Sequence, residues 1–168
     1  MAARDIVITE GWRPGALGAI ITLHAEYYAR EWGFGPVFEA KNARELANFM
    51  QGYDHDRDRL YLALDGEEIV GSLVIDGGGQ SATAAGPRLR WFFLSETCRG
   101  LGLGRRLMDE AMRFVESRSN RCHLTTFAGL DAARALYERA GFRLVEEVVA
   151  DSWGTRVTEQ RFEWTRPA

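Results

Sequence analysis

The middle of the sequence limits the folds that the chain can adopt. There a predicted hairpin leads into a strand, a glycine-rich loop and a helix. Residues 59–64 and 68–75 read as two apolar strands around Asp65-Gly66, a pair that favours a tight hairpin turn. Residues 89–94 form a third apolar segment, and a glycine-rich loop and a segment of helical periodicity follow it. An antiparallel hairpin that continues as a strand–loop–helix unit predicts a mixed sheet with helices on both faces.

The remaining hydrophobic patterns extend this order along the whole chain. They predict a strand and two helices before the hairpin, and a helix, a strand, a helix and two closing strands after the third apolar strand. The expected ranges are 5–9, 14–30, 39–50, 103–115, 123–127, 131–140, 142–149 and 157–164. Because 168 residues is an ordinary size for one compact domain, we expect residues 1–168 to form a single α/β domain with a mixed, mostly antiparallel twisted sheet.

Composition and charge argue against several classes of protein. A net charge of -3 gives no global positive field that would attract nucleic acid or an anionic membrane, and no run of about 18 apolar residues could span a bilayer. The first residues lack the apolar stretch of a signal peptide, so we expect a cytoplasmic protein. Cys98 and Cys122 lack CxxC spacing, and neither His55 nor His123 has a ligand-spaced partner, so we expect free thiols and no bound metal.

The glycine-rich loop carries the clearest signal for a ligand. Gly100, Gly102 and Gly104 alternate where the helix begins, and Arg99 and Arg105 flank them. Glycine permits positive φ and close approach of a ligand, and a helix N-terminus presents unpaired N–H groups, so the loop favours a phosphate or pyrophosphate. It lacks the lysine of a Walker loop and the third glycine of a dinucleotide loop. On the loop alone, a flexible turn that caps a surface helix is the alternative.

Two separated blocks together resemble the GNAT superfamily of acetyl-coenzyme A-dependent N-acetyltransferases. Residues 99–104, RGLGLG, resemble its (Q/R)-x-x-G-x-(G/A) signature, and residues 133–142, ARALYERAGF, resemble its later A-x-x-L-Y-x-x-x-G-F block. The blocks stand at the spacing that the family shows, and the resemblance covers essentially the whole chain. It implies the GNAT fold and transfer of an acetyl group from acetyl-coenzyme A to a primary amine in a ternary complex.

The resemblance also implies which residues hold acetyl-coenzyme A. Main-chain groups near Phe93 and Leu94 would hold the pantetheine arm and the thioester carbonyl. The backbone of the loop would hold the pyrophosphate, through Arg99, Gly100, Leu101, Gly102, Leu103, Gly104 and Arg105. Many family members carry a cofactor-contacting asparagine where Leu130 stands, and many carry proline where Glu96 stands. The first departure favours an alternative function, a non-catalytic acyl-coenzyme A sensor or interaction module, and the second leaves Glu96 as a base or a loop residue.

Candidate catalytic residues lie on two predicted helices. Tyr137 is the group that the resemblance implies as the acid for the leaving thiolate, although on an amphipathic helix alone it would be read as a core residue. His24, Tyr28 and Glu31 stand at i, i+4 and i+7 on one face of the first helix. An imidazole that titrates near pH 6.5 could deprotonate the amine, and the carboxylate of Glu31 could hold its charge. A hydrogen-bonded core histidine is the alternative for His24.

The substrate side is expected in an aromatic and acidic segment, residues 24–40. Tyr28, Trp32 and Phe38 are its candidate contacts for a cationic amine. The segment also resembles the substrate side of acetyltransferase domains fused to MarR-type regulators, without a DNA-binding part. We expect the partner to be a small-molecule or peptide amine, with no nucleic acid and no membrane, and we leave a homodimer open.

Overall fold

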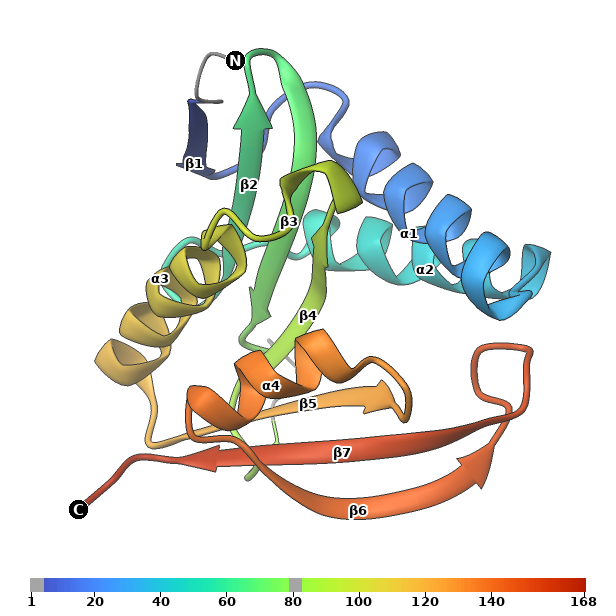
Figure 1. Ribbon diagram of the computed structural model, residues 1–168. Helices are drawn as coiled ribbons and strands as arrows, with labels where there is room; N and C mark the ends of the chain where they lie inside the picture. The colour runs from blue at the N-terminus through green and yellow to red at the C-terminus, as the bar shows by residue number, and fades with distance from the viewer. Residues whose placement is uncertain (1–4, 79–82) are drawn as a thin grey trace.

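The computed structural model describes residues 5–78 and 83–168, which form a twisted sheet with helices on both sides (Figure 1). Within these residues the sheet has seven strands in the order β1-β2-β3-β4-β5-β7-β6. The strands are β1 (Ile6–Glu10), β2 (Arg59–Asp65), β3 (Glu68–Asp76), β4 (Arg88–Leu94), β5 (Arg121–Phe127), β6 (Arg143–Ala150) and β7 (Val157–Thr165). All neighbouring strands pair antiparallel except β4 and β5, which pair parallel. The predicted fold class is confirmed.

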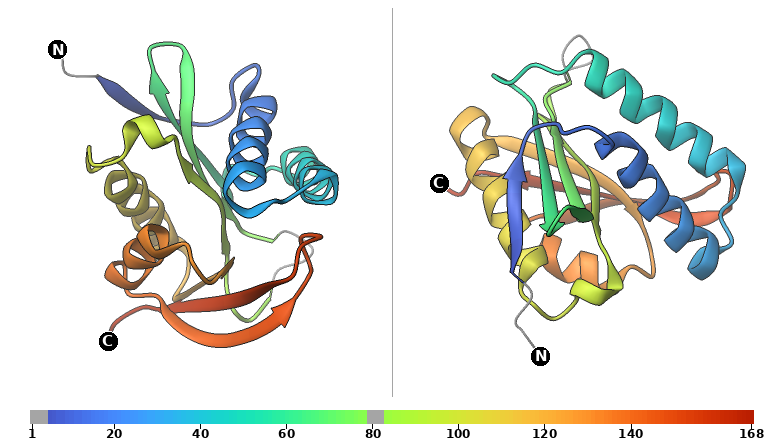
Figure 2. Two further views of the ribbon diagram at one scale, coloured as in Figure 1. Left: turned by 45° about the vertical axis from the view of Figure 1, so that its right-hand side comes forward. Right: turned by 90° about the horizontal axis from the view of Figure 1, so that it is seen from above.

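Two pairs of helices cover the two faces of the sheet (Figure 2). The helices α1 (Ala16–Trp32) and α2 (Pro36–Gln51) pack on one face, and α3 (Leu103–Arg118) and α4 (Asp131–Arg139) pack on the other. Each face has its own apolar core, with Ile20 and Leu46 buried on the first side and Leu107 and Phe142 buried on the second. No helix of the described residues is long and apolar enough to cross a bilayer.

Helix starts differ from the predicted ones because of local backbone chemistry. Helix α1 begins at Ala16, two residues after Pro14, because Gly15 is its N-cap and has a left-handed φ of 85°. Helix α2 begins at Pro36, three residues before the predicted start, and a proline fits the first turn of a helix because its missing N–H has no partner there. These shifts leave the predicted order of elements intact.

The sheet opens between β4 and β5, and this opening positions the candidate site. The two strands pair at a single register, Arg88 with His123, and then diverge toward their carboxyl ends (Figure 1). A bulge in β4 contributes, because the single residue Leu73 of β3 lies opposite both Trp91 and Phe92 of β4, and Trp91 has a φ of 43°. The buried Ser72 hydroxyl donates a hydrogen bond to the Trp91 carbonyl over 2.7 Å. Ligands of open α/β sheets bind at the carboxyl ends of such diverging strands.

Candidate active site

A cleft of about 630 Å³ follows the carboxyl end of β4 and the glycine-rich loop. Phe93 and Leu94 line it from β4, and Leu136 and Tyr137 line it from α4. The loop and the start of α3 contribute Arg99, Gly100, Gly102, Leu103, Gly104 and Arg105. Of the described residues predicted to bind the cofactor, Leu101 alone does not line this cleft, since its side chain is exposed on the surface. The structure therefore brings the other eight predicted residues together around one space.

The glycines of the loop differ in what they do. Gly100 and Gly102 have left-handed φ angles of 78° and 71°, and a Cβ on either would meet no heavy atom within 4 Å. Gly102 is also the N-cap of α3 and has no side-chain cap, so the N–H groups of the first turn lack intrahelical acceptors. Gly104 has a packing role, because a Cβ there would lie 2.9 Å from Leu136 Cδ1 and 3.1 Å from Leu94 Cδ1.

The charged side chains at the mouth of the cleft are exposed and only loosely paired. Arg99 lies 3.8 Å from a carboxylate oxygen of Glu96, and Arg105 lies 3.9 Å from Asp109. Surface pairs of this kind contribute little free energy, so both guanidinium groups can turn toward an anion. Glu96 also accepts a 2.9 Å hydrogen bond from Arg30 of α1. This pairing is consistent with reading Glu96 as a loop residue.

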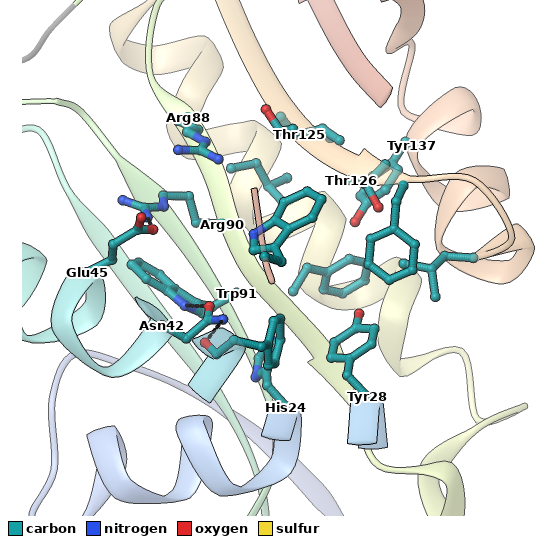
Figure 3. Close-up of a pocket in the computed structure, with 17 residues that line it drawn as sticks. His24, Tyr28, Asn42, Glu45, Arg88, Arg90, Trp91, Thr125, Thr126 and Tyr137 are labelled. Carbon is teal, nitrogen blue, oxygen red and sulfur yellow. Dashed lines mark hydrogen bonds and ion pairs between the residues drawn. The ribbon is translucent and has the colours of Figure 1, made fainter. Parts of the chain in front are cut away.

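A second, smaller cavity of about 100 Å³ lies between α1, α2, β4 and β5 (Figure 3). It shares Tyr28, Phe92, Thr126, Leu130 and Tyr137 with the larger cleft, so the two spaces adjoin at these residues. We call these five residues the junction, and they lie where β4 and β5 have separated. Sequence reasoning did not select Phe92 or Thr126, because nothing in a single sequence indicates that these two strands are parallel neighbours that diverge.

Tyr137 combines the two roles considered from the sequence. Its ring packs in the core, with centroids 6.0 Å from Phe92, 6.1 Å from Phe162 and 6.3 Å from Phe142. Its residue also lines both cavities, and its hydroxyl has no hydrogen-bond partner among the described residues. Burial raises the pKa of Tyr137 above its ordinary value, with a smaller contribution from Tyr28, so the phenol stays protonated.

His24 is a buried neutral imidazole. Its Nδ1 lies 2.8 Å from the Ile20 carbonyl, which can only accept, so Nδ1 carries the proton and Nε2 the lone pair. The ring is 6% exposed, packs 5.1 Å from the Phe93 ring and lines the smaller cavity. Burial lowers the pKa of His24 to about 4, against a weaker opposing effect of the Ile20 hydrogen bond. The expectation of a titration near pH 6.5 is therefore wrong.

The other predicted substrate contacts lie in different places. Tyr28 lines both cavities and Phe38 lines the smaller one. Trp32 instead packs on Phe127, with centroids 4.8 Å apart, and is not among the described residues that line either cavity. Glu31 also lies outside both sets of lining residues described, because it occupies the last turn of α1, where its exposed carboxylate accepts a 2.7 Å hydrogen bond from Arg30.

Comparison with known proteins assigns the family. The model of the "Acetyltransferase (GNAT) family" matches residues 17–142, so the chain belongs to the GNAT acetyltransferase family. No protein of curated function matches the sequence. Among solved structures, an acetyltransferase of the GNAT family from Staphylococcus aureus Mu50 has a TM-score of 0.74 at 18% identity and covers 96% of this chain and 99% of that one.

Two further solved structures show the same fold. An acetyltransferase from Streptococcus agalactiae 2603 has a TM-score of 0.69 at 19% identity, covering 97% of this chain and 99% of that chain. An acyl-CoA N-acyltransferase from Pseudomonas aeruginosa has a TM-score of 0.69 at 18% identity, covering 96% and 100%. At these identities the likeness concerns the fold. The similarity to acetyltransferase domains fused to MarR-type regulators stays a prediction.

Proposed function

We propose that this protein transfers an acetyl group from acetyl-coenzyme A to a primary amine by direct attack in a ternary complex. The observation that supports the proposal most is that the cleft and the smaller cavity adjoin at Tyr28 and Tyr137. Acyl transfer needs an amine held next to a thioester, and two adjoining spaces provide separate places for the two substrates.

The cleft fits coenzyme A on its own chemistry. The uncapped N–H groups of α3 and the open space around Gly100 and Gly102 suit a pyrophosphate, and Arg99 and Arg105 can add charge-assisted hydrogen bonds. Main-chain groups near Phe93 and Leu94 would hold the pantetheine arm, which would bring an activated acyl group to the junction. Leu130 lines both spaces, so an apolar contact replaces the amide that many family members have there.

The residues at the junction have complementary proton roles in this proposal. The raised pKa of Tyr137 keeps its phenol protonated but also makes it a weaker acid, so in this proposal its proton passes to the leaving thiolate in step with cleavage of the C–S bond. With its pKa lowered to about 4, His24 is a weak base, and its neutral Nε2 suits accepting a hydrogen bond from the amine. Burial raises the pKa of Cys122 to about 12, and this thiol is not among the described residues of either cavity, which argues against an acetyl-cysteine intermediate on Cys122.

The competing function is a non-catalytic acyl-coenzyme A sensor, and kinetics with Tyr137→Phe separates the two. We expect wild-type protein to consume acetyl-coenzyme A in the presence of a primary amine, and Tyr137→Phe to lower kcat about 100-fold with little change in coenzyme affinity. Tyr53→Phe is the matched control, because it removes the hydroxyl of a tyrosine that lies outside the described linings of both cavities. Coenzyme binding without turnover on any amine would support the sensor, and an unchanged kcat for Tyr137→Phe would leave that residue a packing role alone.

A further inference from the structure

One cation in the smaller cavity has no partner in the described structure. Arg88, the first residue of β4, lines this cavity. Its Nε atom is buried without a hydrogen-bond partner, and its guanidinium forms no ion pair within residues 5–78 and 83–168. Buried polar groups are normally satisfied, and leaving a charged one unpaired costs free energy. An unpartnered guanidinium beside a cavity therefore indicates a missing anion.

Arg90, two residues along the same strand, shows the contrast. Its guanidinium donates to Asp76 over 3.0 Å and also to Glu45, and it lies 4.1 Å from the centre of the Trp91 ring. Arg90 is therefore fully engaged by the protein. Figure 3 shows it turned to Glu45, while Arg88 lies apart from that pair.

The carboxylates that attract Arg88 are already paired with other cations. Asp76 and Glu45 attract Arg88 from a distance, but both pair directly with Arg90, and Glu45 also pairs with Lys41. Arg90 and Arg161 repel Arg88. Within the described residues, the positive charge of Arg88 thus has no directly bonded anionic partner.

Arg88 and the junction lie at opposite ends of the smaller cavity. Arg88 pairs in register with His123, at the closed end of the opening between β4 and β5. Phe92 and Thr126 line the open end, where the cavity adjoins the cleft. Thr125, whose hydroxyl has no partner among the described residues, also lines the cavity and offers a second hydrogen bond to an anion.

We propose that the acceptor is a small amine that also carries an oxyanion, a carboxylate or a phosphate, which the guanidinium of Arg88 binds at the closed end of the cavity while the amine reaches the junction. This inference rests on the proposed function. A planar guanidinium matches both kinds of oxyanion, because it can donate two parallel hydrogen bonds. The volume of about 100 Å³ has room for several water molecules, which suits a small compound rather than a folded chain.

Matched pairs of amines test the preference in the wild-type protein. The pairs are leucine with 3-methylbutylamine, 5-aminopentanoate with pentylamine, and phosphoethanolamine with ethanolamine. We expect kcat/KM to be about 10- to 100-fold higher for the anionic member of at least one pair, as a charge-assisted contact predicts. The pair that shows the preference identifies carboxylate or phosphate as the anion. Equal or better turnover of the neutral amine in all three pairs would overturn the proposal.

Variants of Arg88 then assign the effect to this side chain. Arg88→Gln should raise KM for the preferred anionic amine about 10- to 100-fold and leave kinetics with its neutral partner almost unchanged, and Arg88→Lys should restore part of the loss. Arg113→Gln is the control, because it neutralises an exposed arginine of α3. A parallel loss for both amines in Arg88→Gln would show that Arg88 only maintains the structure, and thermal unfolding would verify that each variant folds.

A binding measurement without turnover separates this proposal from the proposed function. Calorimetry of wild-type protein and Arg88→Gln would use 4-methylpentanoate and pentanoate for the carboxylates, and ethyl phosphate for the phosphate. Arg88-dependent binding of one of these anions in a protein that acetylates no amine would refute the enzyme and keep the anion site. Acetylation of amines without any Arg88-dependent anion preference would keep the enzyme and refute the anion site.

Discussion

His24 links the stability of the protein to pH, because its imidazole is buried in the neutral form. In the unfolded chain a histidine has a pKa near 6.5, and in the folded chain burial lowers the pKa of His24 to about 4. Between these values the unfolded state binds the proton more readily, so stability rises with pH. The contribution is fully present above about pH 6.5 and is lost as pH falls toward 4. Its size is on the order of 3 kcal/mol.

His24→Asn should remove this part of the pH dependence. Asparagine can still donate a hydrogen bond to the Ile20 carbonyl, but it does not titrate. We expect the free energy of unfolding, measured with urea at several pH values from 7 to 4, to fall less steeply than in the wild type, by up to about 3 kcal/mol over the range. If the free energy of unfolding of His24→Asn fell with pH as steeply as that of the wild type, His24 would not be buried as a neutral imidazole.

At the scale of single elements, the start of α3 depends on a glycine in the left-handed region. The chain offers a matched pair, since Gly102 and Gly15 are both helix N-caps with positive φ and open space at the Cβ position. A side chain at either position is strained, at a cost of about 1–2 kcal/mol if the backbone keeps its conformation. The two helix starts differ in surroundings, because Gly102 lines the cleft and Gly15 is not among the described residues that do.

Gly102→Ala and Gly15→Ala should therefore affect stability alike and coenzyme binding differently. Relief of the strain at Gly102 would turn the N–H groups of α3 away from their present directions. We expect calorimetry to show acetyl-coenzyme A affinity reduced about 10-fold or more in Gly102→Ala and unchanged in Gly15→Ala. Comparable affinities in the two variants, at comparable melting temperatures, would mean that the start of α3 is not the phosphate site.

The elements that could be predicted from the sequence are those whose signals are local. The hairpin turn, which the structure places at Gly66 and Glu67, one residue after the predicted pair Asp65-Gly66, and the glycines before α3 are fixed by the chemistry of adjacent residues. The junction could not be predicted in the same way, because Thr126 and Phe92 line one space only as a result of the parallel pairing and later divergence of β4 and β5. Helical spacing placed Glu31 on the face of His24, but α1 ends at Trp32, so Glu31 lies in its exposed last turn.

At the scale of the whole molecule, the diverging strands divide the sheet into two parts. The β1 to β4 part leads into the loop and α3, and α4 packs against the part made of β5, β7 and β6 (Figure 1). The cleft is lined from both parts, by Gly102 and Leu94 on one side and by Ala133 and Tyr137 on the other. Beyond Arg88 and His123, β4 and β5 do not pair with each other. A ligand that fills the cleft would contact both parts of the sheet and connect them there.

Coenzyme A should therefore stabilise the two parts together. A ligand present at 100 times its Kd stabilises the folded state by about 2.7 kcal/mol, which for a chain of this size corresponds to a melting temperature about 5–10 °C higher. Hydrogen exchange should show added protection both at the start of α3 and along α4, because the cleft joins them. With Gly102→Ala both effects should weaken at the same ligand concentration. Protection confined to α3, with no change in α4, would show that the ligand contacts only one side of the opening and would remove the basis for a junction at Tyr137.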